Sequence, residues 1–331
     1  MKTKMKSAFS GFLWVLVCFL AIISLSCSDA ADSRRRACEP APAKLQGQDT
    51  ASGAYAVTIE KDIAYLGPGR GEKCDIYTPT GPKTNERFGG IVIIHGGGWR
   101  SGDKGKSREQ NIGTTLAKAG YVCISINYLL AKQDQPTWPR NLQDCKTAVQ
   151  FLRKNARRLN LDPDNIGVIG GSAGGHLAAM VGLTGTDNTF EPPGPYQGIS
   201  SEVQAVVPMY GIYDLVKAEP FKPAWQWFLG KTRQQDPNLY ASASPVTHID
   251  ANDPPFLILH GTADTVVNYS QSIELHEKLA RSGVKSRLVL IDRAVHSFDL
   301  QPPQRDLRPV VTAFFDEFLK DKSPARTKEG N

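Results

Sequence analysis

The sequence predicts an α/β protein built on a mostly parallel, doubly wound sheet. Short apolar runs of strand length alternate along the chain with amphipathic segments of helix length. Two of the runs, residues 90–95 and 121–127, are continuously apolar and rich in β-branched residues, which is typical of strands buried on both faces. With 331 residues, of which 40% are hydrophobic and 22% charged, the chain can bury a full core in a single domain.

The expected elements follow one another in order. Residues 57–65 and 74–77 alternate apolar with polar side chains and predict two antiparallel edge strands, closed by Pro79. Residues 141–158 begin after a proline and carry apolar residues at helical spacing, which predicts one helix. The other expected strands are residues 90–95, 121–127, 165–169, 203–208, 256–260 and 286–292, and the other expected helices are residues 108–119, 176–183, 269–282 and 307–319.

Two stretches, residues 186–200 and 212–250, do not fit the alternation. The second is dense in aromatic residues and is expected to be a small insertion. It could be a cap or lid that lines a substrate pocket, or a helical insertion whose aromatic side chains pack on the body of the domain. If it is a lid, the candidate pocket residues are Trp99, Tyr210, Trp225, Trp227 and Phe228.

The amino terminus reads as an export signal. Three lysines precede an uncharged apolar run at residues 9–25, which predicts a signal peptide over residues 1–26, although the run is also long enough to be an uncleaved membrane anchor. Cys27 closes a segment similar to a bacterial lipoprotein box and is the candidate lipidation site, with attachment to a membrane as the consequence. Ser24 stands where such boxes usually carry leucine, so ordinary cleavage near Ala30 is the alternative.

The remaining chain divides into a polar, flexible tether at residues 27–54, a domain at residues 55–322 and a disordered tail at residues 323–331. Cleavage before Cys27 removes three lysines and no acidic residue, so the formal charge falls from +6 to +3. That charge implies no basic partner surface, and no nucleic-acid partner is expected. The expected location is periplasmic, extracellular or membrane-anchored in a bacterium.

Four cysteines follow Cys27. Cys123 falls in an expected buried strand and Cys145 on the apolar face of an expected helix, so both should pack as small apolar side chains. Cys38 and Cys74 could form a disulfide in an oxidising compartment. The chain has no C-x-x-C pair, no zinc-type spacing and no nucleotide-binding G-x-G-x-x-G after the first strand, so we expect no metal and no cofactor.

The segment Val-Ile-Gly-Gly-Ser-Ala-Gly-Gly at residues 168–175 contains G-x-S-x-G with Ser172 at its centre. A strand-like run precedes it and a helix-compatible run follows, which favours a nucleophile elbow, a sharp strand-to-helix turn that presents a reactive serine. A glycine-rich turn with an incidental serine is the alternative.

A reactive serine needs a histidine base and a carboxylate that orients it. Of the six histidines only His296 lies in a loop beyond the last expected strand, where it can reach Ser172. Asp264 follows an expected strand between the two and is the best candidate for the carboxylate, with Asp292 and Asp214 as alternatives.

Acyl transfer also needs donors aimed at the developing oxyanion. The segment H-G-G-G-W at residues 95–99 follows a buried strand, so the backbone amides of Gly97 and Gly98 can converge with that of Ala173 on one oxygen. A phosphate-binding nest is the alternative, but the lysine and hydroxyl of a P-loop are missing.

Taken together, H-G-G-G-W, G-G-S-A-G-G-H, H-G-T-A-D and the late His-Ser-Phe resemble the α/β-hydrolase superfamily. They are near the hormone-sensitive-lipase-like esterases and most like the bacterial BD-FAE-type carboxylesterases. The resemblance extends over residues 63–319. It implies an α/β-hydrolase fold with no metal or cofactor, and a substrate that is a small acyl ester or an acetyl or feruloyl ester on a plant polysaccharide. It also implies a triad of Ser172, Asp264 and His296 and an oxyanion hole of Gly97, Gly98 and Ala173.

Two other functions remain as alternatives to a secreted or lipid-anchored serine carboxylesterase. A serine peptidase or an arylformamidase would have the same fold but hydrolyse an amide bond in place of an ester. Dipeptidyl-type peptidases usually carry a propeller domain before the hydrolase domain. The export signal argues against a cytoplasmic formamidase. The second alternative is a non-catalytic binding protein with a hydrolase fold. Such proteins typically lose a triad residue, whereas this sequence retains all three.

Overall fold

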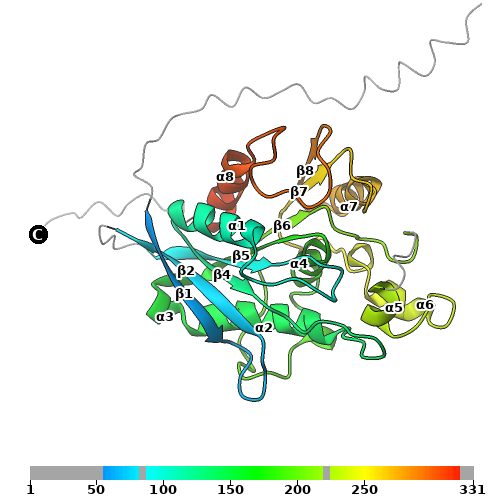
Figure 1. Cartoon of the computed structure of the whole chain (residues 1–331), viewed down its shortest axis with the longest axis horizontal. Helices are drawn as coiled ribbons and strands as arrows, with labels where there is room; N and C mark the ends of the chain where they lie inside the picture. The colour runs from blue at the N-terminus through cyan, green and yellow to red at the C-terminus, as the bar shows by residue number, and fades with distance from the viewer. Residues whose placement is uncertain (1–54, 82–86, 219–223, 321–331) are drawn as a thin grey trace, which may run out of the picture. The chain divides into compact units, whose positions relative to one another are not determined.

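The computed structural model describes residues 55–81, 87–218 and 224–320, which form one α/β unit (Figure 1). Within these residues an eight-stranded sheet has the order β1-β2-β4-β3-β5-β6-β7-β8. The first two pairings in that order are antiparallel and the rest are parallel. The expected mostly parallel, doubly wound sheet is therefore confirmed.

The strands are β1 (Ala56–Ala64), β2 (Lys73–Thr80), β3 (Phe88–Ile94), β4 (Tyr121–Ile126), β5 (Leu161–Gly171), β6 (Ala205–Met209), β7 (Phe256–Gly261) and β8 (Ser286–Ile291). The helices are α1 (Ser107–Lys118), α2 (Arg140–Lys154), α3 (Ala156–Leu159), α4 (Ala173–Leu183), α5 (Ala224–Leu229), α6 (Pro237–Ser242), α7 (Ser270–Arg281) and α8 (Arg308–Leu319), with 3₁₀ turns η2 (Asn188–Phe190) and η3 (Pro245–Thr247).

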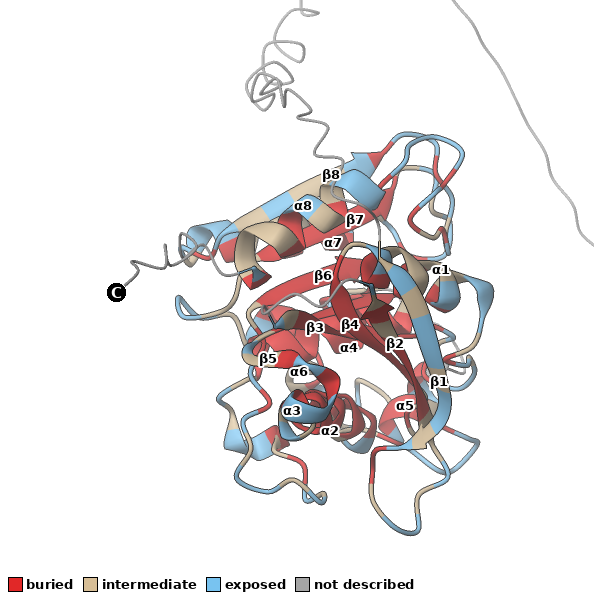
Figure 2. Ribbon diagram, turned by 90° about the vertical axis from the view of Figure 1, so that its left-hand side faces the viewer, coloured by how far each residue is buried: buried red, intermediate tan, exposed pale blue. Residues whose placement is uncertain are grey.

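Helices cover both faces of the sheet and divide the core in two. Apolar residues of α2, α4 and α7 pack on one face, and those of α1 and α8 pack on the other. Figure 2 shows the central strands largely buried, apart from the amino-terminal part of β5, whereas β1 is exposed along much of its length. β5 and β7, which precede two of the candidate site residues, lie inside the sheet, which gives their carboxyl ends a rigid frame, whereas β8 forms the far edge.

Two details differ from the sequence predictions. β2 is not an edge strand, because its other side pairs with β4, for example Cys74 with Ile126, and only β1 lies at that edge. The predicted single helix at residues 141–158 is interrupted at Asn155, which separates α2 from α3. The Asn155 side chain donates a hydrogen bond to the Phe151 carbonyl (2.8 Å) and so competes with the helical backbone.

The described cysteines are buried free thiols. Cys123 and Cys145 pack in the core as predicted, and Cys74 is also free. Cys38 lies outside the described residues, as do the predicted signal, the whole of the predicted tether with Cys27, and the predicted tail. Within residues 55–81, 87–218 and 224–320, no helix is both long enough and apolar enough to span a membrane.

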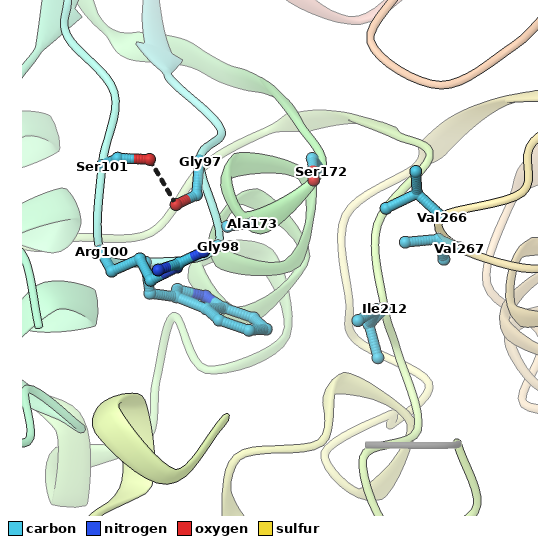
Figure 3. Close-up of a pocket in the computed structure, with 10 residues that line it drawn as sticks. Gly97, Gly98, Arg100, Ser101, Ser172, Ala173, Ile212, Val266 and Val267 are labelled. Carbon is cyan, nitrogen blue, oxygen red and sulfur yellow. Dashed lines mark hydrogen bonds between the residues drawn. The ribbon is translucent and has the colours of Figure 1, made fainter. Parts of the chain in front are cut away.

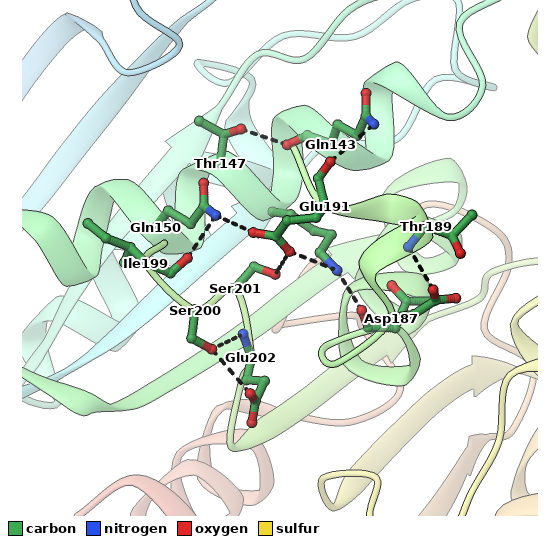
Figure 4. A network of polar contacts seen from close by, with 12 residues as sticks. Gln143, Thr147, Gln150, Asp187, Thr189, Glu191, Ile199, Ser200, Ser201 and Glu202 are labelled. Atoms are coloured by element: carbon green, nitrogen blue, oxygen red, sulfur yellow. Dashed lines mark hydrogen bonds and ion pairs between the residues drawn. The ribbon is translucent and has the colours of Figure 1, made fainter. Parts of the chain in front are cut away.

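The stretch at residues 186–200 adds η2 but no strand, and a polar network ties it to α2 (Figure 4). Glu191 accepts hydrogen bonds from Gln150 Nε2 (2.6 Å) and Ser201 Oγ (3.3 Å). The fully buried Lys146 donates from Nζ to the Thr184 carbonyl (2.5 Å), and its Nζ lies 3.8 Å from Glu191 Oε2. Burial lowers the pKa of the Lys146 amine, although the nearby carboxylates, Glu191 foremost, act in the opposite direction.

Replacing Lys146 by alanine is expected to lower the free energy of unfolding by about 2–3 kcal/mol, because the buried Thr184 carbonyl loses its donor and a cavity opens. Urea denaturation followed by circular dichroism measures the change. Lys154→Ala is the matched control, since Lys154 is exposed on the same helix and its loss should cost less than about 0.5 kcal/mol. Equal stability of the two variants would contradict the prediction.

Candidate active site

Ser172 lies on a sharp turn between β5 and α4. Its backbone has φ 59° and ψ −121°, a conformation that L-residues rarely adopt, and its N–H donates to the Met209 carbonyl on β6 (2.9 Å). Glycines allow this approach: a Cβ on Gly174 would lie 2.1 Å from the Ile94 carbonyl oxygen, and one on Gly170 would lie 2.3 Å from the Gly174 oxygen. The structure places the serine on the strand–turn–helix that the motif predicts.

Loops after β5, β7 and β8 bring the three predicted triad residues together. His296 Nε2 lies 2.9 Å from Ser172 Oγ, and His296 Nδ1 lies 2.7 Å from Asp264 Oδ2. The two alternative carboxylates lie elsewhere. Asp292 is exposed and pairs with Arg293 (3.2 Å), while Asp214 accepts from the amides of its own turn.

The Asp264 carboxylate is held by four donors. Oδ1 accepts from the backbone amides of Val266 (2.8 Å) and Val267 (2.9 Å), and Oδ2 accepts from His296 and from His260 Nε2 (3.1 Å). Burial by itself raises the pKa of the carboxyl, but the hydrogen bonds from His260, His296 and Val267 outweigh burial and hold the pKa well below its usual range. Asp264 is therefore ionised at neutral pH, and His296 presents its proton to it from Nδ1.

Tyr210 supports the loop that carries His296. Its hydroxyl donates to the Phe298 carbonyl (2.5 Å) and accepts from Arg108 Nη1 (3.2 Å), and its ring lies 5.0 Å from the His296 ring. Burial raises the pKa of Tyr210 to about 12, so the hydroxyl stays a donor. Tyr210 thus fixes the loop from behind and does not line the pocket, which corrects its prediction as a pocket residue.

A cavity of about 240 Å³ opens beside Ser172 (Figure 3). Figure 3 shows Ser172 between Gly97 and Gly98 on one side and Val266 and Val267 on the other. The lining consists of small, apolar and a few polar residues with one cation and no anion: Gly97, Gly98, Trp99, Arg100, Ser101, Ser172, Ala173, Ile212, Val266 and Val267. Of the five predicted pocket residues, only Trp99 is among them.

The aromatic residues of the insertion pack on the body of the domain. Phe228 stacks on Trp99 with ring centroids 4.3 Å apart, and Trp99 Nε1 donates to His176 Nδ1 (3.2 Å). Burial lowers the pKa of His176 to about 4, so this imidazole is neutral and can accept at Nδ1 while Nε2 donates to the Ala243 carbonyl (2.7 Å). Phe228 is therefore the support beneath a pocket wall and not part of the lining.

Both tryptophans of the insertion also lie outside the lining of the cavity. Trp225 is buried against Tyr240, with ring centroids 6.0 Å apart, and Trp227 lies under the Arg100 guanidinium (5.4 Å). None of Trp225, Trp227 and Phe228 lines the cavity beside Ser172, because Trp225 and Phe228 are buried in the core and Trp227 lies against the outer side chain of Arg100. Most described apolar side chains of the insertion pack on the domain, as the second alternative expects, while Ile212 at its start lines the cavity.

The predicted oxyanion residues line the cavity together with Ser172. Gly97 and Gly98 have φ of 115° and 60°, and a Cβ on Gly97 would lie 2.0 Å from the Ser101 carbonyl oxygen, so the turn requires glycine. Within the described residues, neither glycine amide donates to a backbone acceptor. Ala173 is the first residue of α4, where amides lack intrahelical partners and the helix dipole favours negative charge.

Sequence reasoning missed several residues of this site. His260 could have been found from the sequence, because it belongs to the H-G-T-A-D motif that also contains Asp264. No sequence motif marks Arg108, which donates a hydrogen bond to Tyr210. The same holds for the apolar wall of the cavity, made by Ile212, Val266 and Val267. Their places depend on contacts between segments far apart in the sequence.

A parallel sheet with a serine on a nucleophile elbow, a histidine after the last strand and a buried carboxylate after the preceding strand defines an α/β hydrolase. The BD-FAE family model matches residues 74–279, and the chain belongs to this family. The resemblance predicted from the motifs is confirmed.

The chain is similar to esterase LipQ of Mycobacterium tuberculosis, with 33% identity over 261 residues, which are 77% of this chain and 61% of LipQ. The chain thus spans less than two thirds of the length of LipQ. A truncated form of a carbohydrate esterase from gut microbiota has a similar structure (TM-score 0.71, 29% identity, 81% of this chain and 98% of that one). Thermogutta terrifontis esterase 2 phosphorylated by paraoxon also has a similar structure (TM-score 0.62, 26% identity, 81% of this chain and 96% of that one).

Proposed function

We propose that this protein is a serine carboxylesterase. The observation that carries the proposal is the continuous hydrogen-bonded chain from Ser172 Oγ through His296 to Asp264 at the mouth of a cavity. Membership of the BD-FAE family and similarity to proteins named esterases support it.

The geometry supports acylation in a defined order. Ser172 Oγ attacks the ester carbonyl carbon while its proton moves to His296 Nε2, and the ionised Asp264 stabilises the imidazolium. The amides of Gly97, Gly98 and Ala173 stabilise the oxyanion of the tetrahedral intermediate. The alcohol then leaves with the proton from His296 Nε2.

Deacylation reverses these roles. A water molecule gives a proton to His296 Nε2 and attacks the acyl carbon, and the carboxylic acid leaves as Ser172 recovers its proton. This cycle uses groups of the chain, the ester and one water molecule, and the expectation of no metal or cofactor stays a prediction from the sequence.

We further propose a short acyl group carried by a plant polysaccharide, with acetyl preferred over feruloyl. The cavity of about 240 Å³ is smaller than the roughly 300–1,000 Å³ of pockets that enclose drug-sized ligands. The carbohydrate esterase among the similar structures supports a polymer-borne ester, as does the export signal predicted at residues 1–26. Lipidation of Cys27 would hold the enzyme at a membrane facing such polymers.

A panel of p-nitrophenyl esters, acetylated xylan and methyl ferulate tests the proposal. We expect kcat/KM to be highest for acetate to butyrate and at least about tenfold lower for dodecanoate, because carbons beyond the cavity stay in water. Acetate release from xylan should exceed ferulate release. Comparable hydrolysis by the Ser172→Ala variant would overturn the nucleophile assignment, and a preference for dodecanoate would overturn the short-acyl proposal.

A further inference from the structure

A second histidine shares the triad carboxylate. His260 is the penultimate residue of β7, is completely buried and lies outside the cavity lining. Its Nε2 lies 3.1 Å from Asp264 Oδ2, the same oxygen that meets His296, and 3.0 Å from the Val267 carbonyl oxygen. Its Nδ1 lies 2.6 Å from Ser272 Oγ on α7. Nothing in the acylation cycle uses this ring.

These contacts decide where the His260 proton lies. The ionised Asp264 carboxylate and the Val267 carbonyl are both pure acceptors, so Nε2 must be the donor to them. Nδ1 can then accept from the Ser272 hydroxyl, and the imidazole is fully satisfied in its neutral form.

We propose that His260 is a positioning residue for Asp264: a neutral imidazole with its proton on Nε2 that fixes the carboxylate oxygen against which His296 is aligned. With His260 in place, four donors occupy the four lone-pair directions of the carboxylate, so Asp264 cannot rotate away. The hydrogen bond from His260 also stabilises the negative charge on Asp264 Oδ2, so this oxygen attracts the proton on His296 less strongly. This inference rests on the proposed esterase function.

Two isosteric variants separate the contacts of the two ring nitrogens. The amide of His260→Gln reaches about as far as Nε2 and restores a donor to Asp264, whereas the amide of His260→Asn reaches about as far as Nδ1 and keeps only the contact with Ser272. We expect His260→Asn to lower kcat about tenfold with little change in KM, because Asp264 and His296 lose alignment. His260→Gln should stay within about threefold of the unmodified protein.

The pH profile supplies a readout that a packing role would not move. In His260→Asn the unshared Oδ2 attracts the His296 proton more strongly, so the acid limb of kcat/KM should move up by about half a pH unit. His260→Gln should leave the limb in place. Equal losses in both variants with an unmoved acid limb would show that His260 only fills space, and would overturn the proposal.

Nitrogen-15 NMR of histidine-labelled protein tests the proton position without relying on the folding of the Asn variant. The His260 signals, identified by their loss in His260→Gln, should show Nε2 protonated and Nδ1 unprotonated at neutral pH, also in Ser172→Ala. A proton on Nδ1 at neutral pH would overturn the proposal. Absence of ester hydrolysis in the unmodified protein would instead overturn the esterase function, so the two failures are distinguishable.

Discussion

Replacing Ser172 by alanine is expected to lower kcat for p-nitrophenyl acetate by a factor on the order of 10⁵. The variant keeps the glycine amides and the cavity but has no oxygen 2.9 Å from His296 Nε2 to form the acyl-enzyme. Only the residual rate from the oxyanion donors should remain. Initial rates under saturating substrate, with the protein purified to exclude traces of host esterase, measure the effect.

A covalent probe checks the same residue independently of turnover. Paraoxon, which phosphorylates the structurally similar Thermogutta terrifontis esterase 2, should add one diethyl phosphoryl group per chain, located at Ser172 by peptide mass spectrometry. Ser172→Ala should stay unlabelled. The control variant Ser200→Ala, which changes an exposed serine outside the candidate site, should be labelled fully. Labelling of Ser172→Ala at another serine would contradict the assignment.

Replacing Asp264 by asparagine is expected to lower kcat about 10⁴-fold with KM little changed. Asparagine has nearly the same shape, but its neutral side chain offers one acceptor where the carboxylate now meets four donors, and it stabilises neither the Nδ1–H form of His296 nor the imidazolium. Steady-state kinetics at pH 7 to 8 measure the loss.

Asp292→Asn is the matched control for Asp264, because this carboxylate lies four residues before His296 but is 81% exposed and pairs with Arg293. Its kcat should stay within about twofold of the unmodified protein. A large loss in Asp292→Asn with an active Asp264→Asn would move the orienting role to Asp292.

The folded protein holds the pKa of Asp264 well below its value in the unfolded chain, about 3.9. The ionised carboxylate therefore stabilises the fold at pH above that unfolded value, and this contribution is lost as the pH falls toward the folded pKa. The stability penalty of Asp264→Asn should accordingly be visible at pH 7 and shrink in acid.

Elements with strong periodicity could be predicted closely from the sequence. The buried β-branched runs became β3 and β4, and the motif around Ser172 became the turn from β5 to α4. The prediction was wrong where a single side chain or a distant partner decided the structure. Asn155 interrupts a helix through its own amide, and β2 leaves the edge because β4 pairs with it.

The sequence by itself determined the reactive turn and the order of the triad residues, because glycines that permit close backbone approach and loops that follow strands are properties of short segments. Only the tertiary structure decided which carboxylate meets His296, that His260 shares it, and that Phe228 supports Trp99 from behind. Hydrogen bonds act over about 3 Å, and the residues they join here come from separate strands and loops whose relative positions are set by packing of the whole core.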